Sequence, residues 1–114
     1  MPKHSASLDR VFQALSNPTR RAVVQRLSAG PAAVSELARP FDMALPSFLQ
    51  HLEVLEACGL VGSEKAGRVR TYRLTPPPLR AAEGWIGKQR AKWEGRLDQL
   101  DEHLHHLKEQ ELDP

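Results

Sequence analysis

Two polar side chains, Ser47 and Gln50, stand three residues apart near the start of an amphipathic stretch that predicts a helix. The amino end of a helix fits into the major groove of DNA, where an amide can form two hydrogen bonds with adenine and a hydroxyl can bond a base or a phosphate. We therefore expect Pro46, Ser47 and Gln50 to contact DNA. His51 is a further candidate, although its place near the apolar side suits a hydrogen-bonded structural histidine equally well. The plain alternative for Ser47 and Gln50 is a solvated helix face.

Basic side chains follow this helix in a segment that predicts a β-hairpin. Two strand-like runs flank an expected turn at Ala66-Gly67, and alternation along the second run places Arg68 and Arg70 on one face. Together with Lys65, these arginines are expected to bind the DNA backbone or an adjacent minor groove. As an alternative, the same charges only keep the hairpin soluble.

Four short helices are predicted before the hairpin, because apolar side chains repeat there at steps of three and four residues. Asn17 and Pro18, a capping residue followed by proline at the first helical position, open the second helix. Ser35 is expected to cap the third. The fourth helix runs over Leu45–Cys58, and Gly59 ends it. Its buried stripe is predicted to contain Leu45, Phe48, Leu52 and Leu55.

One long helix, or two helices in line, is predicted after the prolines at positions 76–78, which are expected to end the second strand. Three glycines inside it, Gly84, Gly87 and Gly95, each cost about 1 kcal/mol relative to alanine, so a kink or a close helix approach is expected near them. The predicted fold class is mainly α with a small β-hairpin. A winged helix-turn-helix spans residues 1–75, and the long C-terminal helix, residues 76–114, belongs to the same single domain.

Composition places the chain among small proteins with one hydrophobic core and no membrane span. The 114 residues contain no run of eighteen apolar side chains, no secretory signal pattern and a single cysteine, Cys58, so a cytoplasmic protein is expected. Residues 1–75 hold ten basic and six acidic side chains, whereas residues 76–114 hold six basic and eight acidic ones. A basic first part suits contact with a polyanion, and an acidic helical tail suits contact with another protein.

Five motifs, taken in order, resemble the successive signatures of ArsR-family repressors. The motifs are Asn17-Pro18-Thr19-Arg20-Arg21, Val34-Ser35-Glu36-Leu37-Ala38, Gln50-His51-Leu52-Glu53-Val54-Leu55, Ala57-Cys58-Gly59-Leu60-Val61, and Gly67-Arg68 to Tyr72-Arg73-Leu74. The resemblance covers roughly residues 8–75. It implies a winged-helix homodimer that binds operator DNA, often its own promoter, and that dimerises through its first and last helices. On this basis the dimer interface is expected to contain Leu8, Val11, Phe12, Ile86, Trp93, Leu97, Leu100 and Leu104.

The chain departs from the family pattern at three places. Ala44 stands where a capping serine is usual, and Leu49 stands where a serine often faces DNA, so the fourth helix has less hydrogen-bonding capacity than is typical. The metal-sensing members carry cysteines in the third helix, at the positions of residues 35–38 here, and none is present. A thiolate metal site of that kind is therefore excluded.

A second kind of metal site concerns the C-terminal helix. Some ArsR proteins bind zinc there through an Asp-x-His pair on one chain and a His-x-x-Glu pair on the other. Asp101, His103, His106 and Glu109 supply both fragments, but the two histidines are much closer together than the family pattern requires. We therefore prefer a solvated helical end and expect no metal and no cofactor.

The sequence predicts a DNA-binding transcriptional regulator that acts as a homodimeric repressor at an inverted-repeat operator. Its expected partners are double-stranded DNA and a second copy, with no membrane, and the sequence names no inducer. An enzyme is not expected, because there is no glycine-rich phosphate loop, no nucleophile elbow and no HExxH. One alternative is a protein-interaction module in which Trp85, Ile86, Trp93 and the leucines bind another partner. Another alternative is a repressor gated by metal at the last helix.

Overall fold

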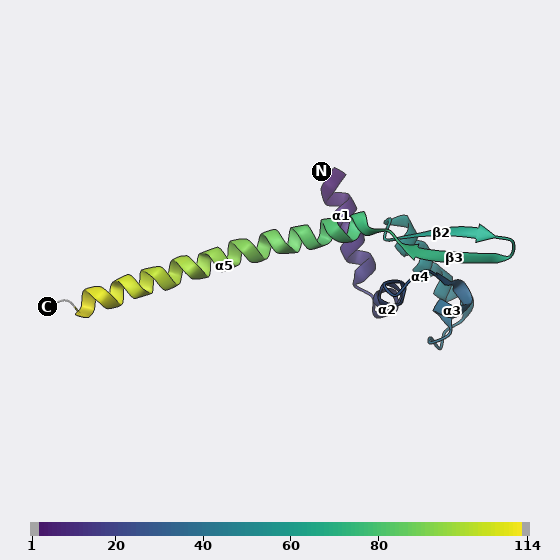
Figure 1. Cartoon of the computed structure of the whole chain (residues 1–114), viewed down its shortest axis with the longest axis horizontal. Coiled ribbons are helices and arrows are strands. Elements are labelled where there is room, and N and C mark those ends of the chain that lie inside the picture. Colours follow the sequence, from purple (N-terminus) through teal and green to yellow (C-terminus); the bar gives the residue numbers. More distant parts are fainter. Residues whose placement is uncertain (1–2, 113–114) are drawn as a thin grey trace. The chain divides into compact units, whose positions relative to one another are not determined.

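The computed structural model describes residues 3–112. Residues 1–2 of the predicted winged helix-turn-helix and residues 113–114 of the predicted C-terminal helix lie outside the described residues. The elements follow the predicted order of helices, hairpin and long helix (Figure 1). They are α1 (Lys3–Leu15), α2 (Pro18–Leu27), β1 (Ala32–Ala33), α3 (Val34–Ala38), α4 (Leu45–Ala57), β2 (Val61–Ala66), β3 (Val69–Leu74) and α5 (Pro76–Leu112). The predicted fold class, mainly helical with a small β-sheet and a long C-terminal helix, is confirmed.

The chain divides into two compact units, residues 1–82 and residues 83–114, and α5 contributes residues to both. The first unit holds α1 to α4 and the sheet, whereas the described residues of the second, 83–112, all lie in α5. Across residues 3–112, no helix combines the length and apolar character that would let it cross a membrane.

The turn between α1 and α2 is fixed by the first of the five motifs. Asn17 caps α2, because its Oδ1 accepts a hydrogen bond from the backbone nitrogen of Arg20 at 3.1 Å, and Pro18 occupies the first turn. Arg20 reaches back to the end of α1, where Nε donates to the Ala14 carbonyl at 2.7 Å. Arg21 does the same at the Leu15 carbonyl, at 2.8 Å. The two arginines thus satisfy carbonyl groups that a helix end leaves without partners.

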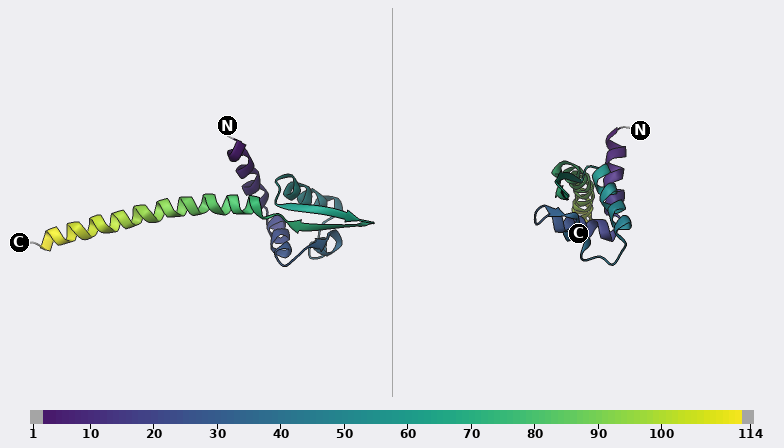
Figure 2. Two further views of the ribbon diagram at one scale, coloured as in Figure 1. Left: turned by 45° about the horizontal axis from the view of Figure 1, so that its top comes forward. Right: turned by 90° about the vertical axis from the view of Figure 1, so that its right-hand side faces the viewer.

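The sheet has three antiparallel strands in the order β1-β3-β2, one more than predicted. β1 was missed because two alanines carry no alternating pattern, and only pairing with β3, at Ala32 with Tyr72, makes them a strand. The hairpin turn also lies one residue later than predicted, since Ala66 still pairs with Val69. Gly67 has a φ of +63°, which glycine adopts freely, and it therefore takes the first position of the two-residue turn. Figures 1 and 2 show the tip of this hairpin extending beyond the helices of the first unit.

The core of the first unit is formed by apolar side chains from every one of its helices and from the sheet. α4 supplies Phe48, Leu52 and Leu55, all fully buried, and it packs against α1, α2 and β2. Leu45 was predicted to belong to this buried stripe, but it is 52% exposed. The prediction is wrong at this residue because Leu45 stands at the first position of α4, where the helix extends beyond the elements that cover its later turns.

Two further predictions about helix ends are corrected. α3 begins at Val34 with Ala33 as its cap residue, so Ser35 lies inside the helix and does not cap it. The prolines at positions 76–78 form the first turn of α5, where a missing N–H costs nothing and the fixed φ suits a helix. α5 then continues without a break through Gly84, Gly87 and Gly95, and a Cβ added at any of them would meet nothing within 4 Å. Neither a break nor a close approach marks these glycines within the chain.

Candidate nucleic-acid interface

One side of α4 is anchored in the core, and the other side is exposed at its amino end. Phe48, Leu52 and Leu55 anchor the helix in the core, whereas Pro46, Ser47 and Gln50 are exposed. Its cap residue, Ala44, makes no side-chain hydrogen bond to the first turn. This agrees with the expectation from the sequence that a capping serine is replaced here. The exposed edge presents one amide and one hydroxyl together with apolar groups.

His51 is engaged inside the first unit. The Nη1 atom of Arg20 lies 3.2 Å from His51 Nδ1, and the histidine is half-buried. A guanidinium has no acceptor atom, so Nδ1 accepts in this contact and the imidazole proton lies on Nε2. Arg20 Nη2 also donates to the Gln13 carbonyl at 3.2 Å. One arginine therefore joins α1, α2 and α4, and the hydrogen-bonded alternative for His51 matches this arrangement.

The hairpin brings positive charge to one of its two faces. Lys65 and Arg70 are direct cross-strand partners, and both side chains are exposed. Like charges placed opposite each other on a hairpin are destabilising unless a negative charge lies between or beside them. The same face carries Val61 and Tyr72, which are buried at the base of the hairpin. The charged tip is thus a continuation of the face that packs on the core.

Arg70 is held by a chain of hydrogen bonds that leads to α4. Its Nη1 donates to Ser63 Oγ at 2.9 Å, and Ser63 Oγ donates to Glu56 Oε1 at 2.9 Å. Tyr72 lies on the same face of β3, and burial, assisted by the charge of Glu56, raises its pKa above the ordinary value of 10.0. The phenol therefore stays neutral at physiological pH. The hydrogen bonds connect the hairpin to the last turn of α4.

Arg68 was predicted by strand alternation to share a face with Arg70, but it lies outside β3, so the alternation does not extend to it. It belongs to the two-residue turn after Gly67 at the tip of the hairpin, and its side chain is exposed. The opposite face carries an ion pair, in which Arg73 Nη1 lies 3.8 Å from Glu64 Oε1. Arg73 also lies across Gly62, whose added Cβ would meet the guanidinium at 3.2 Å. The acidic side chain of the hairpin is thus on the face away from Lys65 and Arg70.

The residues expected at the dimer interface divide into two groups. Val11 is 3% exposed and belongs to the core, whereas Leu8 and Phe12 are half-buried beside it. The group on α5 is exposed throughout, at between 41% and 64% of each side chain. These residues are Ile86, Trp93, Leu97, Leu100 and Leu104, continued by Leu107.

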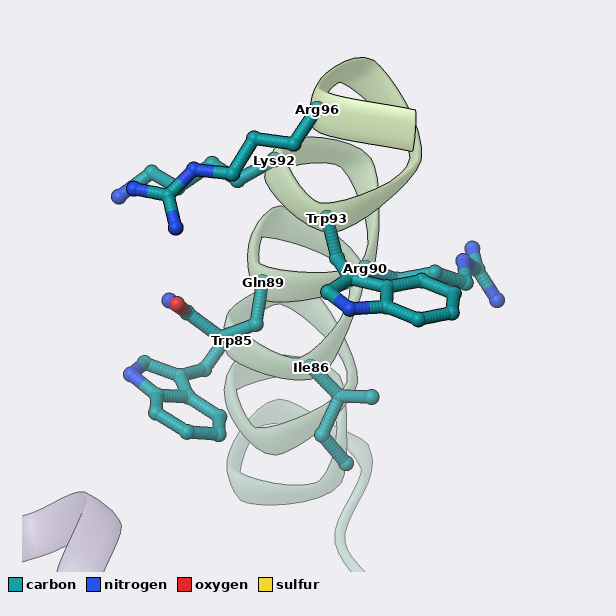
Figure 3. A pocket seen from close by; sticks show the side chains of 7 residues that line it. All are labelled: Trp85, Ile86, Gln89, Arg90, Lys92, Trp93 and Arg96. Atoms are coloured by element: carbon teal, nitrogen blue, oxygen red, sulfur yellow. The ribbon is translucent and has the colours of Figure 1, made fainter. Parts of the chain in front are cut away.

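A hollow on α5 is lined by residues of that helix alone, which Figure 3 shows as side chains. They are Trp85, Ile86, Gln89, Arg90, Lys92, Trp93 and Arg96. Since one helix supplies all of its walls, the hollow is an open face, unlike the enclosed clefts that bind small ligands. Ile86 and Trp93 on this face are 50% and 64% exposed.

The histidines near the end of α5 make local contacts. His105 Nε2 lies 3.6 Å from Glu109 Oε1, and His106 Nε2 lies 3.2 Å from Gln110 Nε2. Among the described residues, no three metal-ligating side chains come together in the way a bound ion requires. The geometry of the single chain therefore gives no argument for a metal here.

This chain is similar to known proteins in both sequence and structure. A family model described as a helix-turn-helix domain matches residues 15–63. The HTH-type transcriptional regulator Rv2034 of Mycobacterium tuberculosis is 49% identical over 75 residues, which cover 66% of this chain and 70% of that protein. The crystal structure of an ArsR family transcriptional regulator, RHA00566, is 52% identical with a TM-score of 0.77, and the match covers 82% of this chain and 97% of that one.

A solution structure from Mycobacterium bovis is also similar, with 25% identity and a TM-score of 0.57 over 90% of this chain and 93% of that one. That protein is described as the homodimeric winged helix-turn-helix DNA-binding domain of a possible ArsR-family transcriptional regulator. These similarities agree with the arrangement of α3, α4 and the hairpin.

Sequence reasoning missed the contacts of Arg20 and the link from Arg70 through Ser63 to Glu56. The motif containing Arg20 was recognised, but no local pattern indicates that its side chain reaches His51, which is 31 residues away. The sequence indicates the contact between Ser63 and Glu56 only weakly, through a hydroxyl and a carboxylate on either side of the turn between α4 and β2.

Proposed function

This chain belongs to the ArsR family of winged helix-turn-helix transcriptional regulators, and on that premise we propose that it is a homodimeric repressor. It binds an inverted-repeat operator, including one at its own promoter, and acts in the cytoplasm, where bacterial DNA lies. The function is binding, without a catalytic step. Two copies of α4 enter successive major grooves about 34 Å apart, which is one turn of DNA.

A single arrangement in the first unit carries this proposal. The exposed amino end of α4 lies in the same unit as a hairpin whose tip presents Lys65, Arg68 and Arg70. In this arrangement Pro46, Ser47 and Gln50 meet base edges, and the hairpin cations meet phosphates or the adjacent minor groove. His51 supports α4 through Arg20, with only its Nε2 side left for a phosphate.

The dimer is supported by the exposed stripe of α5 and by the similarity to a homodimeric relative. Six large apolar side chains repeat at steps of three, four or seven residues, from Ile86 to Leu107. A stripe with this spacing is the seam by which two helices pack. Residues 76–114 are thus proposed as the dimerisation helix, with Leu8 and Phe12 of α1 at the edge of the interface.

The first test is fluorescence anisotropy of the purified protein with DNA from upstream of its own gene, against scrambled DNA, over a series of salt concentrations. Preferential binding that weakens steeply with salt is the expected result. A folded dimer that binds neither DNA, or binds both equally, would contradict the proposal. It would instead support a module that binds another protein through α5.

Substitutions separate the two kinds of DNA contact. Gln50→Ala should reduce the preference for operator over scrambled DNA by about 1–3 kcal/mol, because the amide contacts a base. Arg70→Ala should weaken binding to both DNAs similarly and lower the salt dependence by about one phosphate contact. If Gln50→Ala leaves the preference unchanged, our orientation of α4 in the groove is wrong.

A further inference from the structure

Two large apolar side chains are exposed at the amino end of α4. Leu45, the first residue of the helix, is 52% exposed, and Met43, two residues earlier, is 36% exposed. Among the described side chains of the first unit, the other large apolar ones in this class are Val54 and Val69. Two of these four side chains thus lie at the end of α4 where DNA contact is proposed.

Leu45 is positioned more firmly than Met43, because it stands in the helix. Leu49 follows one turn later on the same side and is packed against the core, so the side of α4 that begins at Leu45 is anchored. Pro46 stands next to Leu45 and fixes the backbone of the first turn. The leucine is therefore a rigidly placed apolar group, which does nothing for the core of its own unit.

A duplex of DNA suits this surface better than an apolar protein partner does. The hairpin of the same unit presents three exposed cations, Lys65, Arg68 and Arg70, which attract a polyanion. The first turn of α4 also has no side-chain cap; Pro46 has no N–H and Phe48 N–H donates to the Ala44 carbonyl, so the N–H groups of Leu45 and Ser47 remain for a phosphate. An apolar side chain at the end of a helix that enters the major groove meets base edges, and the C5-methyl of thymine is the apolar group that these edges present there.

We propose, on the premise of the DNA-binding function above, that Leu45 contacts the C5-methyl of a thymine in each half of the operator. The base pair at that position is selected by van der Waals contact with its methyl group. Gln50 and Ser47 then read neighbouring positions by hydrogen bonds. This arrangement supplies specificity at the amino end of α4, where Ala44 offers no polar side chain.

The test uses deoxyuridine, which keeps every hydrogen-bonding group of thymidine and lacks only the methyl. Binding sites are first selected by the full chain from a pool of randomised duplexes. Each T of the selected site is then replaced by dU, in both half-sites together, and affinity is measured by anisotropy. At one position the replacement should weaken binding about 10- to 25-fold, since each buried methyl contributes about three- to fivefold and there are two half-sites.

Variants assign the effect to Leu45. Leu45→Ala should bind the T and dU duplexes equally, with an affinity close to that of the unchanged protein for the dU duplex. Val54→Ala is the matched control, because Val54 is an exposed apolar residue of the same helix, two turns further along. It should retain the full response to dU. Thermal unfolding of each variant checks that the fold is kept.

Three results would overturn the proposal, and they are distinguishable from one another. Sequence-specific binding with no position sensitive to dU, or with no T in the selected site, removes the methyl contact and leaves the proposed function standing. An equal loss in Leu45→Ala and the unchanged protein shows that another group contacts the methyl. Failure to select any sequence removes the proposed function, and this inference with it.

Discussion

The same helical spacing of apolar residues is found in both compact units, but these residues are buried in the first unit and exposed in the second. In residues 1–82, apolar stripes on α1, α2 and α4 face one another and are buried. In residues 83–114, a longer stripe with the same spacing is exposed from Ile86 to Leu107. A single helix has no second surface on which to bury its own stripe, so the second unit needs a partner that the first does not. The spacing of apolar residues therefore predicts that a helix face is covered, but it does not predict which surface covers it.

The two units also carry separate spectroscopic probes. The single tyrosine, Tyr72, lies in the first unit, and both tryptophans, Trp85 and Trp93, lie in the second. Tyrosine absorbance therefore reports on the first unit, and tryptophan emission reports on the second. The comparison can be tested one unit at a time in the same sample.

The largest effect is expected from charges placed in the exposed stripe. Leu97→Asp combined with Leu100→Asp puts four carboxylates into the proposed interface of each dimer, so the dissociation constant should rise at least about 1,000-fold. Light scattering should show a monomer, and tryptophan emission should shift to the red. Gln99→Asp adds a carboxylate on the same helix outside the stripe and should remain dimeric. A dimeric double variant would remove the assignment of α5 to the interface.

A second prediction compares one leucine from each unit. Leu52 is fully buried, so Leu52→Ala should lower the free energy of unfolding by about 2–5 kcal/mol at any protein concentration. Leu100 is 51% exposed within its chain, so Leu100→Ala should destabilise only at concentrations where the dimer forms. Urea unfolding followed by circular dichroism at two concentrations makes this measurement. Equal losses of unfolding free energy at both concentrations for both variants would contradict the distinction between a stripe buried within its chain and a stripe buried by dimerisation.

A smaller difference in unfolding free energy is expected between an arginine that joins helices of the first unit, Arg20, and an exposed arginine of α5, Arg90. Arg20 contacts the carbonyl groups of Gln13 and Ala14 and the ring of His51, and a lysine cannot reproduce this fork. Arg20→Lys should cost about 1–2 kcal/mol in unfolding free energy. Arg90 contacts Glu94 at 3.9 Å on an exposed surface, so Arg90→Lys should cost less than about 0.5 kcal/mol. Similar costs for the two variants would contradict the role given to Arg20.

The smallest effect is a dependence of stability on high pH. The folded-state pKa of Tyr72 is raised above 10.0, so the folded chain holds its phenol proton more tightly than the unfolded chain does. Stability from this group is complete below the unfolded pKa and is lost as pH rises through the folded one. An absorbance titration should give a midpoint above that of the urea-unfolded chain. Tyr72→Phe should remove the tyrosine contribution to the pH dependence, and coincident midpoints would show that burial does not perturb the phenol.

Much of the first unit follows from local signals in the sequence. Asn17-Pro18 opens α2 and Gly59 ends α4, because capping and left-handed turns depend on residue type at one position. The buried faces of the helices also follow, since Phe48, Leu52 and Leu55 repeat at helical spacing. The same local rules placed the hairpin to within one residue.

Tertiary structure decided what these local rules leave open. Ala32 and Ala33 form a strand only because β3 lies beside them, and Leu45 is 52% exposed although its spacing continues the buried stripe of α4. Arg20 and His51 meet because α1, α2 and α4 pack together. The sequence by itself determined which faces are apolar and where the elements begin and end, since these depend on neighbours along the chain. Contacts between distant segments depend on packing in space, and only the fold settles them.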